Sequence, residues 1–219
     1  MTRTLYSGTR NASSWAFRAW LALKEAGVPF DEVVVDIRKP HRFANLATIA
    51  EFSPPGAVPV LVDGETVIYD SLAIMEYANE LSGGRLLPKD LKARAHARSL
   101  AAWQHSGLSG LCPELSFESA FYTDRRSMSD REISESTRIF DAWEQELSRS
   151  NGPYLVGVLS LADLCFMPTV LRLTAHMRSM ESWPLSQVWT TVLLGRPAVQ
   201  EWLAEARTLP PVNLDEYRK

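Results

Sequence analysis

The stretch "GAVPVLVDGETVIYDSLAIMEY", residues 56–77, contains the clearest local structural signals in the chain. Two β-branched runs flank the dipeptide Asp63-Gly64, which favours a tight turn between antiparallel strands. A helix is predicted over "SLAIMEYANEL", residues 71–81, because Gly83 and Gly84 follow it as stop signals. The stretch therefore predicts a β-hairpin followed by a helix.

Pro59 enters the first strand run directly after Val58. A proline lacks the N–H that a strand ladder needs, so two interpretations are open: a trans proline at a strand start, or a cis Val58–Pro59 bond. In the cis case the N–H and C=O of Val58 would face outward. They would then pair with an extended peptide-like ligand in the manner of an added strand.

Asp70 and Ser71 lie at the start of the following helix. Free backbone N–H groups and the positive end of the helix dipole attract a carboxylate there, and the Asp70 carboxylate attracts an ammonium. The pair would thus hold both charges of an α-amino-acid group. Simple N-capping of the helix is the alternative interpretation.

Upstream, "TRNASSWAFRAWLALKEAGVPFDEVVVDI", residues 9–37, predicts a helix that ends at Gly27, followed by a strand. Asn11, Ser13 and Ser14 lie at the helix start, where they either cap the helix or stabilise a thiolate. With the strand "RTLYSG" before this stretch and a weaker helix "PHRFANLATIAEF" after it, the predicted order is β-α-β-α-β-β-α. The crossovers favour a parallel first pair of strands.

Residues 90–207 show helical patterning with little strand character. The predicted fold class is therefore α/β followed by all-α: a small domain over 1–81, a linker over 82–90 and an all-helical domain over 91–219. Within the helical domain, Ser160 and Asp163 have the S-x-x-D spacing of a capping box, which predicts a helix start with a structural role.

Composition narrows the function. A net charge of −3 without a basic block argues against nucleic acid as the main partner. The sequence contains no apolar run of 18 residues, so no membrane span is expected. The two cysteines, Cys112 and Cys165, form no disulfide framework, and "MTRTLYSGTR" has no hydrophobic leader segment, so a cytoplasmic location is expected. The four histidines lack metal-ligand spacing, so no metal is expected.

Together, "AVPVL", "DSLAIMEY" and "SLADLCFMP" in this order resemble the cytosolic glutathione transferase superfamily over nearly the whole chain. "SSWAFRAWLALKEAGVPF" is most similar to bacterial serine-type members related to the zeta and theta classes. The resemblance implies a thioredoxin-like βαβαββα domain, an all-helical domain, glutathione as co-substrate, a small electrophile as second substrate, no metal and a homodimer.

The resemblance also implies roles for individual residues. Val58 and Pro59 match the valine and cis-proline that pair with the cysteinyl backbone of glutathione, and Asp70 and Ser71 match the acidic-serine pair that holds the γ-glutamyl group. Many relatives carry Lys or Gln before the valine to reach the glycine carboxylate, but this chain has Ala57. His41, in the basic turn "RKPHR", is a candidate for that role, with a solvated turn as the alternative.

The segment that contacts the sulfur departs from the family pattern, because Asn11 occupies the first motif position in place of serine. Asn11, Ser13 and Ser14 all stay candidates, and a serine hydroxyl is preferred because it donates at the helix end. Trp15, His105 and Leu108 are candidates for the electrophile pocket, and each of them is equally compatible with an interior position.

Three functions follow from the resemblance. The leading one is a glutathione transferase that activates the thiol for attack on a small electrophile. The second is a glutathione-dependent cis-trans isomerase of the zeta (maleylacetoacetate/maleylpyruvate) type, which needs cations such as Arg10, Arg18 or the "RKPHR" turn to hold two carboxylates. The third is a glutathione-fold binding protein without turnover.

Overall fold

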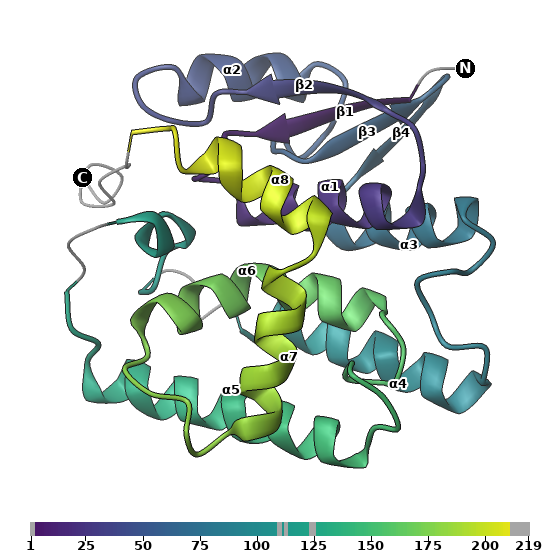
Figure 1. The fold of residues 1–219 in the computed structure, drawn as a ribbon. Coiled ribbons are helices and arrows are strands. Elements are labelled where there is room, and N and C mark those ends of the chain that lie inside the picture. The colour runs from purple at the N-terminus through teal and green to yellow at the C-terminus, as the bar shows by residue number, and fades with distance from the viewer. Residues whose placement is uncertain (1–2, 109–110, 112–113, 123–125, 211–219) are drawn as a thin grey trace. The chain divides into compact units, whose positions relative to one another are not determined.

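The computed structural model describes residues 3–108, 111, 114–122 and 126–210 (Figure 1). The chain divides into two units. The first runs to Arg85 and is rejoined by the C-terminal segment from Glu201, and the second runs from Leu86 to Gln200. The sequence-based ranges assign the segment from Glu201 to the helical domain. In the structure its Trp202 stacks on Phe17 of the first unit, with ring centroids 4.7 Å apart.

The first unit contains the order of strands and helices that the sequence predicts. Its elements are β1 (Arg3–Gly8), α1 (Ser14–Ala26), β2 (Asp31–Val35), α2 (Arg42–Ala50), β3 (Val60–Asp63), β4 (Thr66–Tyr69) and α3 (Ser71–Leu81). The βαβαββα prediction is therefore confirmed, including the hairpin, whose turn residues are Gly64 and Glu65, because Asp63 still pairs with Thr66.

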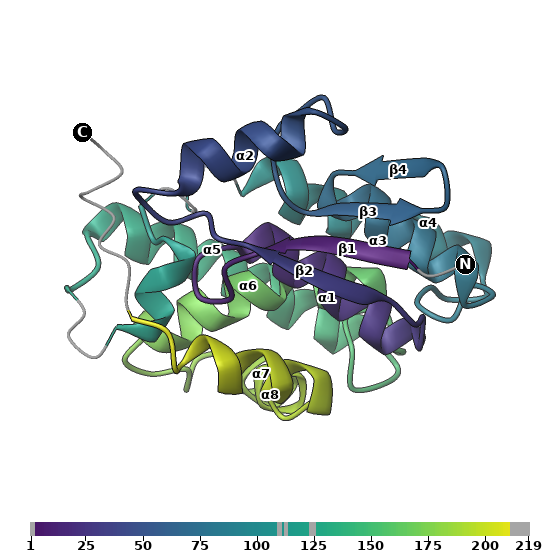
Figure 2. The ribbon, with the colours of Figure 1, turned by 90° about the horizontal axis from the view of Figure 1, so that it is seen from above.

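Within the described residues, four strands form one sheet in the order β2-β1-β3-β4, which can be followed across Figure 2. β1 and β2 are parallel, as predicted, and β3 runs antiparallel to both β1 and β4. Helices α1 and α3 cover one face of the sheet and α2 covers the other (Figure 1). The fully buried residues of the sheet, α1 and α3 include Leu5, Phe17, Leu21, Leu61 and Ile74.

The strand register brings three chain segments to one edge of this sheet. Tyr6 of β1 lies opposite Val60 of β3, and Val60 lies opposite Tyr69 of β4. The residues that follow β1, precede β3 and follow β4 therefore meet at the same edge. Of the residues predicted from the sequence to bind glutathione, Val58, Pro59, Asp70, Ser71 and the three candidates for the sulfur contact belong to these segments, whereas His41 precedes α2.

Local chemistry explains the limits of α1. The Ser13 hydroxyl oxygen accepts the Ala16 N–H at 3.2 Å, so Ser13 is the N-cap. At the other end, Gly27 has φ 68°, a left-handed conformation that glycine adopts at little cost, and its N–H returns to the last turn. Both ends are as the sequence predicts.

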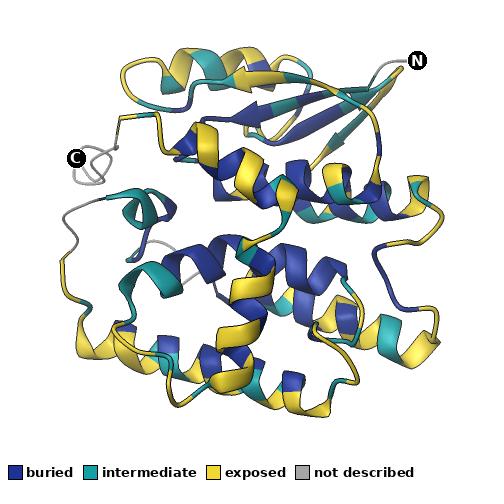
Figure 3. Ribbon diagram, viewed as in Figure 1, coloured by how far each residue is buried: buried dark blue, intermediate teal, exposed yellow. Residues whose placement is uncertain are grey.

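The second unit is helical. Its elements are α4 (Leu91–Ala102), the π-helix η1 (Trp103–Gly107), the 3₁₀-helix η2 (Phe117–Phe121), α5 (Asp130–Arg149), α6 (Leu161–His176) and α7 (Pro184–Leu194), and α8 (Pro197–Ala206) continues from it into the first unit. Residues 161–173 of α6 are all buried, and Figure 3 shows this helix dark blue along most of its length. Along the part of the chain that the structure describes, no helix is long and apolar enough to cross a membrane.

The predicted capping box at the start of α6 is confirmed. The buried Asp163 carboxylate accepts from the Ser160 N–H at 2.9 Å, the Leu155 N–H at 3.0 Å and the Trp189 indole N–H at 2.9 Å. Burial raises the pKa of Asp163, and these hydrogen bonds oppose that effect. Asp163 thus ties α7 and the preceding loop to the start of α6. Cys165, two residues later, is fully buried.

Candidate functional site

Gly8, the last residue of β1, lies at the centre of the sheet edge where the three segments meet. A Cβ placed on Gly8 would lie 2.7 Å from Ser13 Cβ, 2.9 Å from Ser13 Oγ and 3.0 Å from Val58 Cγ2. The distances to Ser13 are shorter than real Cβ contacts and the distance to Val58 is tight, so only glycine fits here without a shift of its neighbours. The Ser13 and Val58 side chains therefore both lie against the same point beside Gly8.

Val58 lies outside the strand ladder. The ladder between β1 and β3 ends at the pair of Tyr6 and Val60, and the Val58–Pro59 peptide bond is cis. Among the described residues, none forms a hydrogen bond with the peptide groups of Val58, which is half-buried. The peptide groups of Val58 are thus available to an extended ligand at the sheet edge.

Asp70 and Ser71 start α3 beside this edge. The Asp70 carboxylate accepts the N–H groups of Leu72 at 2.8 Å and Ala73 at 3.3 Å, so it caps the helix. Its backbone has φ 75° and ψ 133°. This conformation is rare for a residue other than glycine and costs on the order of 1–3 kcal/mol. A non-glycine residue kept in such a conformation is more common at ligand sites than at ordinary helix caps.

The Ser71 hydroxyl is the more informative group. Ser71 is 1% exposed, and its Oγ has no hydrogen-bond partner among the described residues. A buried hydroxyl left unpaired costs about 1–3 kcal/mol, so native proteins rarely keep one without a use. Its position at the first residue of α3, beside Asp70, suits a carboxylate ligand.

The three candidates for the sulfur contact differ in their hydrogen bonds. Ser13 Oγ accepts from Ala16, and no described residue accepts from its hydroxyl hydrogen, which leaves that hydrogen for a ligand. Ser14 is engaged by other interactions within the protein. Asn11 is fully buried, and its Nδ2 donates to the Pro210 carbonyl at 2.9 Å. Because a carbonyl only accepts, this bond fixes the orientation of the Asn11 amide.

The basic turn before α2 places its side chains differently. Arg38 Nε donates to Asp36 Oδ1 at 2.9 Å, and this contact is the main reason that the pKa of Asp36 is lowered to about 2. His41 precedes α2, is exposed and makes no capping hydrogen bond. Arg38 is thus paired with a carboxylate, whereas His41 has no carboxylate partner among the described residues.

The candidates for the electrophile pocket belong to different units. Trp15 of the first unit is 39% exposed, with the Arg18 guanidinium carbon 4.4 Å from its ring centroid. His105 lies in η1 of the second unit, and Leu108, which follows η1, is 2% exposed. Leu108 also lines a cavity of about 250 Å³ within the second unit. A pocket built from all three residues stays a prediction.

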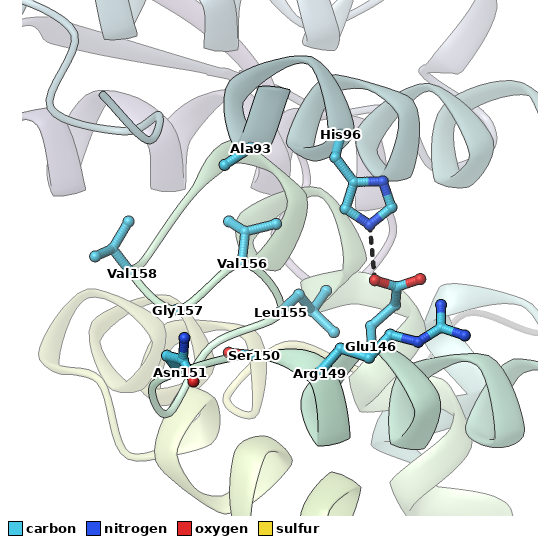
Figure 4. Close-up of a pocket in the computed structure, with 10 residues that line it drawn as sticks. All are labelled: Ala93, His96, Glu146, Arg149, Ser150, Asn151, Leu155, Val156, Gly157 and Val158. Atoms are coloured by element: carbon cyan, nitrogen blue, oxygen red, sulfur yellow. Dashed lines mark hydrogen bonds and ion pairs between the residues drawn. The ribbon is translucent and has the colours of Figure 1, made fainter. Parts of the chain in front are cut away.

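Another cavity, of about 550 Å³, lies in the second unit between α4, the end of α5 and residues 150–158 (Figure 4). Its most polar feature is the pair of His96 and Glu146, whose Nε2 and Oε2 are 2.7 Å apart. No residue predicted from the sequence to bind substrate lines this cavity. Among the residues that the structure describes, no group of three or more His, Cys, Asp or Glu side chains is placed to hold a metal.

The fold defines a class: a thioredoxin-like domain with a candidate ligand site at one sheet edge, followed by a helical domain. Comparison with known families agrees. A glutathione S-transferase N-terminal domain model matches residues 12–81, and a glutathione S-transferase C-terminal domain model matches residues 117–206.

Known proteins extend the likeness. The probable maleylacetoacetate isomerase 2 of Drosophila melanogaster is 32% identical over 184 residues, 83% of this chain and 78% of that protein. The maleylacetoacetate isomerase of Mus musculus is 31% identical and covers 82% of each chain. A solved glutathione S-transferase-I, bound with lactoylglutathione, is 25% identical with a TM-score of 0.76, over 94% of this chain and 100% of that one. The chain belongs to the glutathione S-transferase family.

Proposed function

We propose that this protein is a glutathione transferase that activates the glutathione thiol for attack on a small electrophilic substrate. The observation that carries the proposal is the buried Ser71 hydroxyl, which has no partner within the described part of the chain and lies beside Asp70 at the start of α3. The relatives support it, because a solved transferase of the same fold is bound with a glutathione derivative.

The sheet edge offers a partner for each part of the tripeptide. The peptide groups of Val58 pair with the cysteinyl backbone, and Pro59 ends the ladder so that those groups stay open. The Ser71 hydroxyl and the N-terminus of α3 bind the γ-glutamyl carboxylate, while the Asp70 carboxylate attracts the γ-glutamyl ammonium. His41 is proposed for the glycine carboxylate, because it is an exposed donor with no carboxylate partner among the described residues.

Ser13 is the proposed donor to the sulfur. Its hydroxyl oxygen accepts from the backbone and no described residue accepts from its hydrogen, whereas the Asn11 amide is bonded to Pro210. A free thiol of pKa about 8.5 is only about 3% thiolate at pH 7. A shift of roughly two units, worth about 2.7 kcal/mol, makes the thiolate dominant. The Ser13 hydroxyl and the N-terminus of α1 are groups that supply such a shift.

A zeta-type isomerase is the second candidate, and the names of two relatives favour it. In that reaction the thiolate adds to a conjugated double bond, the resulting single bond rotates, and glutathione leaves unchanged. The substrate carries two carboxylates that need cations. Arg10 forms ion pairs with Glu32 at 2.6 Å and Glu205 at 3.0 Å, whereas Nε and Nη1 of the buried Arg18 have no hydrogen-bond partner among the described residues. Arg18 is therefore the proposed cation for a substrate carboxylate in this second candidate.

Product analysis separates the candidates. The purified protein is incubated with glutathione and either a panel of small electrophiles or a cis-configured conjugated diacid, and products are identified by mass spectrometry. Consumption of glutathione into a conjugate supports the transferase, and an isomerised diacid with unconsumed glutathione supports the isomerase. Glutathione binding without any product would mean a binding protein and would contradict both.

Two further properties are part of the proposal. Trp15, His105 and Leu108 are proposed to contact the electrophile, and the protein is proposed to be a cytoplasmic homodimer, as the family resemblance implies. Sedimentation equilibrium of the purified chain tests the dimer. A single species at the mass of one chain across the working concentration range would contradict it.

A further inference from the structure

The loop between β1 and α1 is a tight turn that ends at Ser13. The N–H groups of Ala12 and Ser13 both donate to the Thr9 carbonyl at 2.9 Å. Arg10 and Asn11 form the body of this turn, so a displacement of either residue also displaces Ser13. Whatever holds Arg10 and Asn11 therefore sets where the Ser13 hydroxyl lies.

A segment about 190 residues further along the chain holds both of them. The Trp202 indole N–H donates to the Arg10 carbonyl at 3.0 Å, and the Glu205 carboxylate pairs with Arg10 Nε at 3.0 Å. The Pro210 carbonyl accepts from Asn11 Nδ2 at 2.9 Å. Three contacts from one segment thus converge on two consecutive residues of the turn.

The Arg10 side chain is fixed from several directions. Its guanidinium carbon lies 4.2 Å from the Trp202 ring centroid and 5.0 Å from that of Trp20, and Glu32 of β2 pairs with its Nη2 at 2.6 Å. The Arg10 side chain is 7% exposed, so these charge contacts act in a poorly solvated setting. Arg10 is therefore a rigid link between the sheet and the C-terminal segment.

We infer that the segment from Trp202 to Pro210 is a positioning element for catalysis, in which Trp202 and Glu205 place the Ser13 hydroxyl against the sulfur of glutathione. This inference rests on the proposed role of Ser13. Hydrogen-bond strength falls steeply with distance and angle, and a misplacement of about 1 Å can cost about a hundredfold in rate. A segment that served only to cover α1 would not need three contacts to the turn itself.

The chain offers a matched control on the same helix. Glu201 of α8 pairs with Lys24 of α1 at 2.8 Å, and its side chain is 56% exposed, close to the 52% of Glu205. Glu201→Gln removes one α8 ion pair far from the turn, whereas Glu205→Gln removes the ion pair to Arg10. Trp202→Phe removes the indole donor and part of the buried ring system but keeps an aromatic ring for packing. A difference between Glu205→Gln and Glu201→Gln therefore reports the effect of contact with the turn, apart from the general effect of losing an ion pair on α8.

Two readouts are measured on the full-length chain. The first is hydrogen exchange of the Ala12 and Ser13 amides, which requires no ligand. The second is the pKa of the bound glutathione thiol, from thiolate absorbance against pH. In Trp202→Phe and Glu205→Gln we expect at least tenfold faster exchange and a thiol pKa raised by about 0.5 unit or more. Glu201→Gln should match the wild type in both.

Unchanged amide exchange and thiol pKa in Glu205→Gln and Trp202→Phe would overturn the inference. Should Trp202→Phe fail to fold, Glu205→Gln, which alters a half-exposed side chain, decides alone. Failure of the proposed function has a different signature: the wild type would show no shift of the thiol pKa, while the exchange contrast between Glu205→Gln and Glu201→Gln would still report whether the segment holds the turn.

Discussion

Ser71→Ala is predicted to weaken glutathione binding while leaving the fold at least as stable as before. The hydroxyl is buried and unpaired, so its removal takes away an unsatisfied group and is expected to raise the free energy of unfolding by about 1 kcal/mol. With ligand bound, the same hydroxyl donates to a carboxylate, a bond worth about 1.5–3 kcal/mol. The dissociation constant of glutathione should therefore rise about 10- to 100-fold.

Calorimetric titration measures the affinity, and urea denaturation without ligand measures the stability. Ser53→Ala is the matched control, because Ser53 is also fully buried with an unpaired Oγ but is not among the proposed ligand contacts. It should gain similar stability and bind glutathione as the wild type does. If Ser71→Ala binds glutathione with wild-type affinity, or loses both stability and affinity, the assignment of this hydroxyl to the ligand is refuted.

Three other predictions follow from the structure. Gly8→Ala inserts a methyl group within 3.0 Å of Ser13 and is expected to lower kcat/KM by about tenfold or more; wild-type kinetics would contradict the close packing at the sheet edge. Asp163→Ala leaves buried donors unpaired and should cost about 3–5 kcal/mol in urea denaturation, and a loss under about 1 kcal/mol would argue against its anchoring role. The pair with Arg126 is the main reason that the pKa of Glu132 is lowered from 4.5 to about 2, so its stabilisation is fully present above pH 4.5 and is lost as the pH falls toward 2. Because the Arg126 side chain is 58% exposed and screened, Glu132→Gln should remove only about 1–2 kcal/mol of this acid dependence, and an unchanged acid limb in a pH series of denaturation curves would contradict it.

The parts of the fold that local chemistry determines are the parts that the sequence predicts well. Asp63-Gly64 fixes a hairpin and Gly27 ends a helix, because each acts on its own few neighbours. The packing of Trp202 against Phe17 carries no local pattern, since it joins residues that are far apart in the chain. The helical pattern over 90–207 therefore predicts α8 but not the unit to which its end belongs.

The candidate site divides in the same way. The sequence points to Val58 and Asp70 through a proline at a strand start and a helix start, and the structure shows a cis Val58–Pro59 bond and a positive φ at Asp70. Their role as ligand contacts stays a prediction. The sequence alone does not choose among Asn11, Ser13 and Ser14 for the sulfur contact, because the choice depends on which of their hydrogen-bonding groups are already used within the folded protein. The bond from Asn11 to Pro210 is one such contact, and only the folded chain brings these two residues together.

The most direct test of the central claim is the pKa of the glutathione thiol bound to the wild type, to Ser13→Ala and to Ser14→Ala, from thiolate absorbance against pH. We predict a wild-type value about two units below the free thiol value of about 8.5, a rise of about 1–2 units in Ser13→Ala, and no change in Ser14→Ala. A wild-type thiol with its ordinary pKa, or a Ser13→Ala variant that keeps the lowered one, would contradict the proposed thiol activation by Ser13.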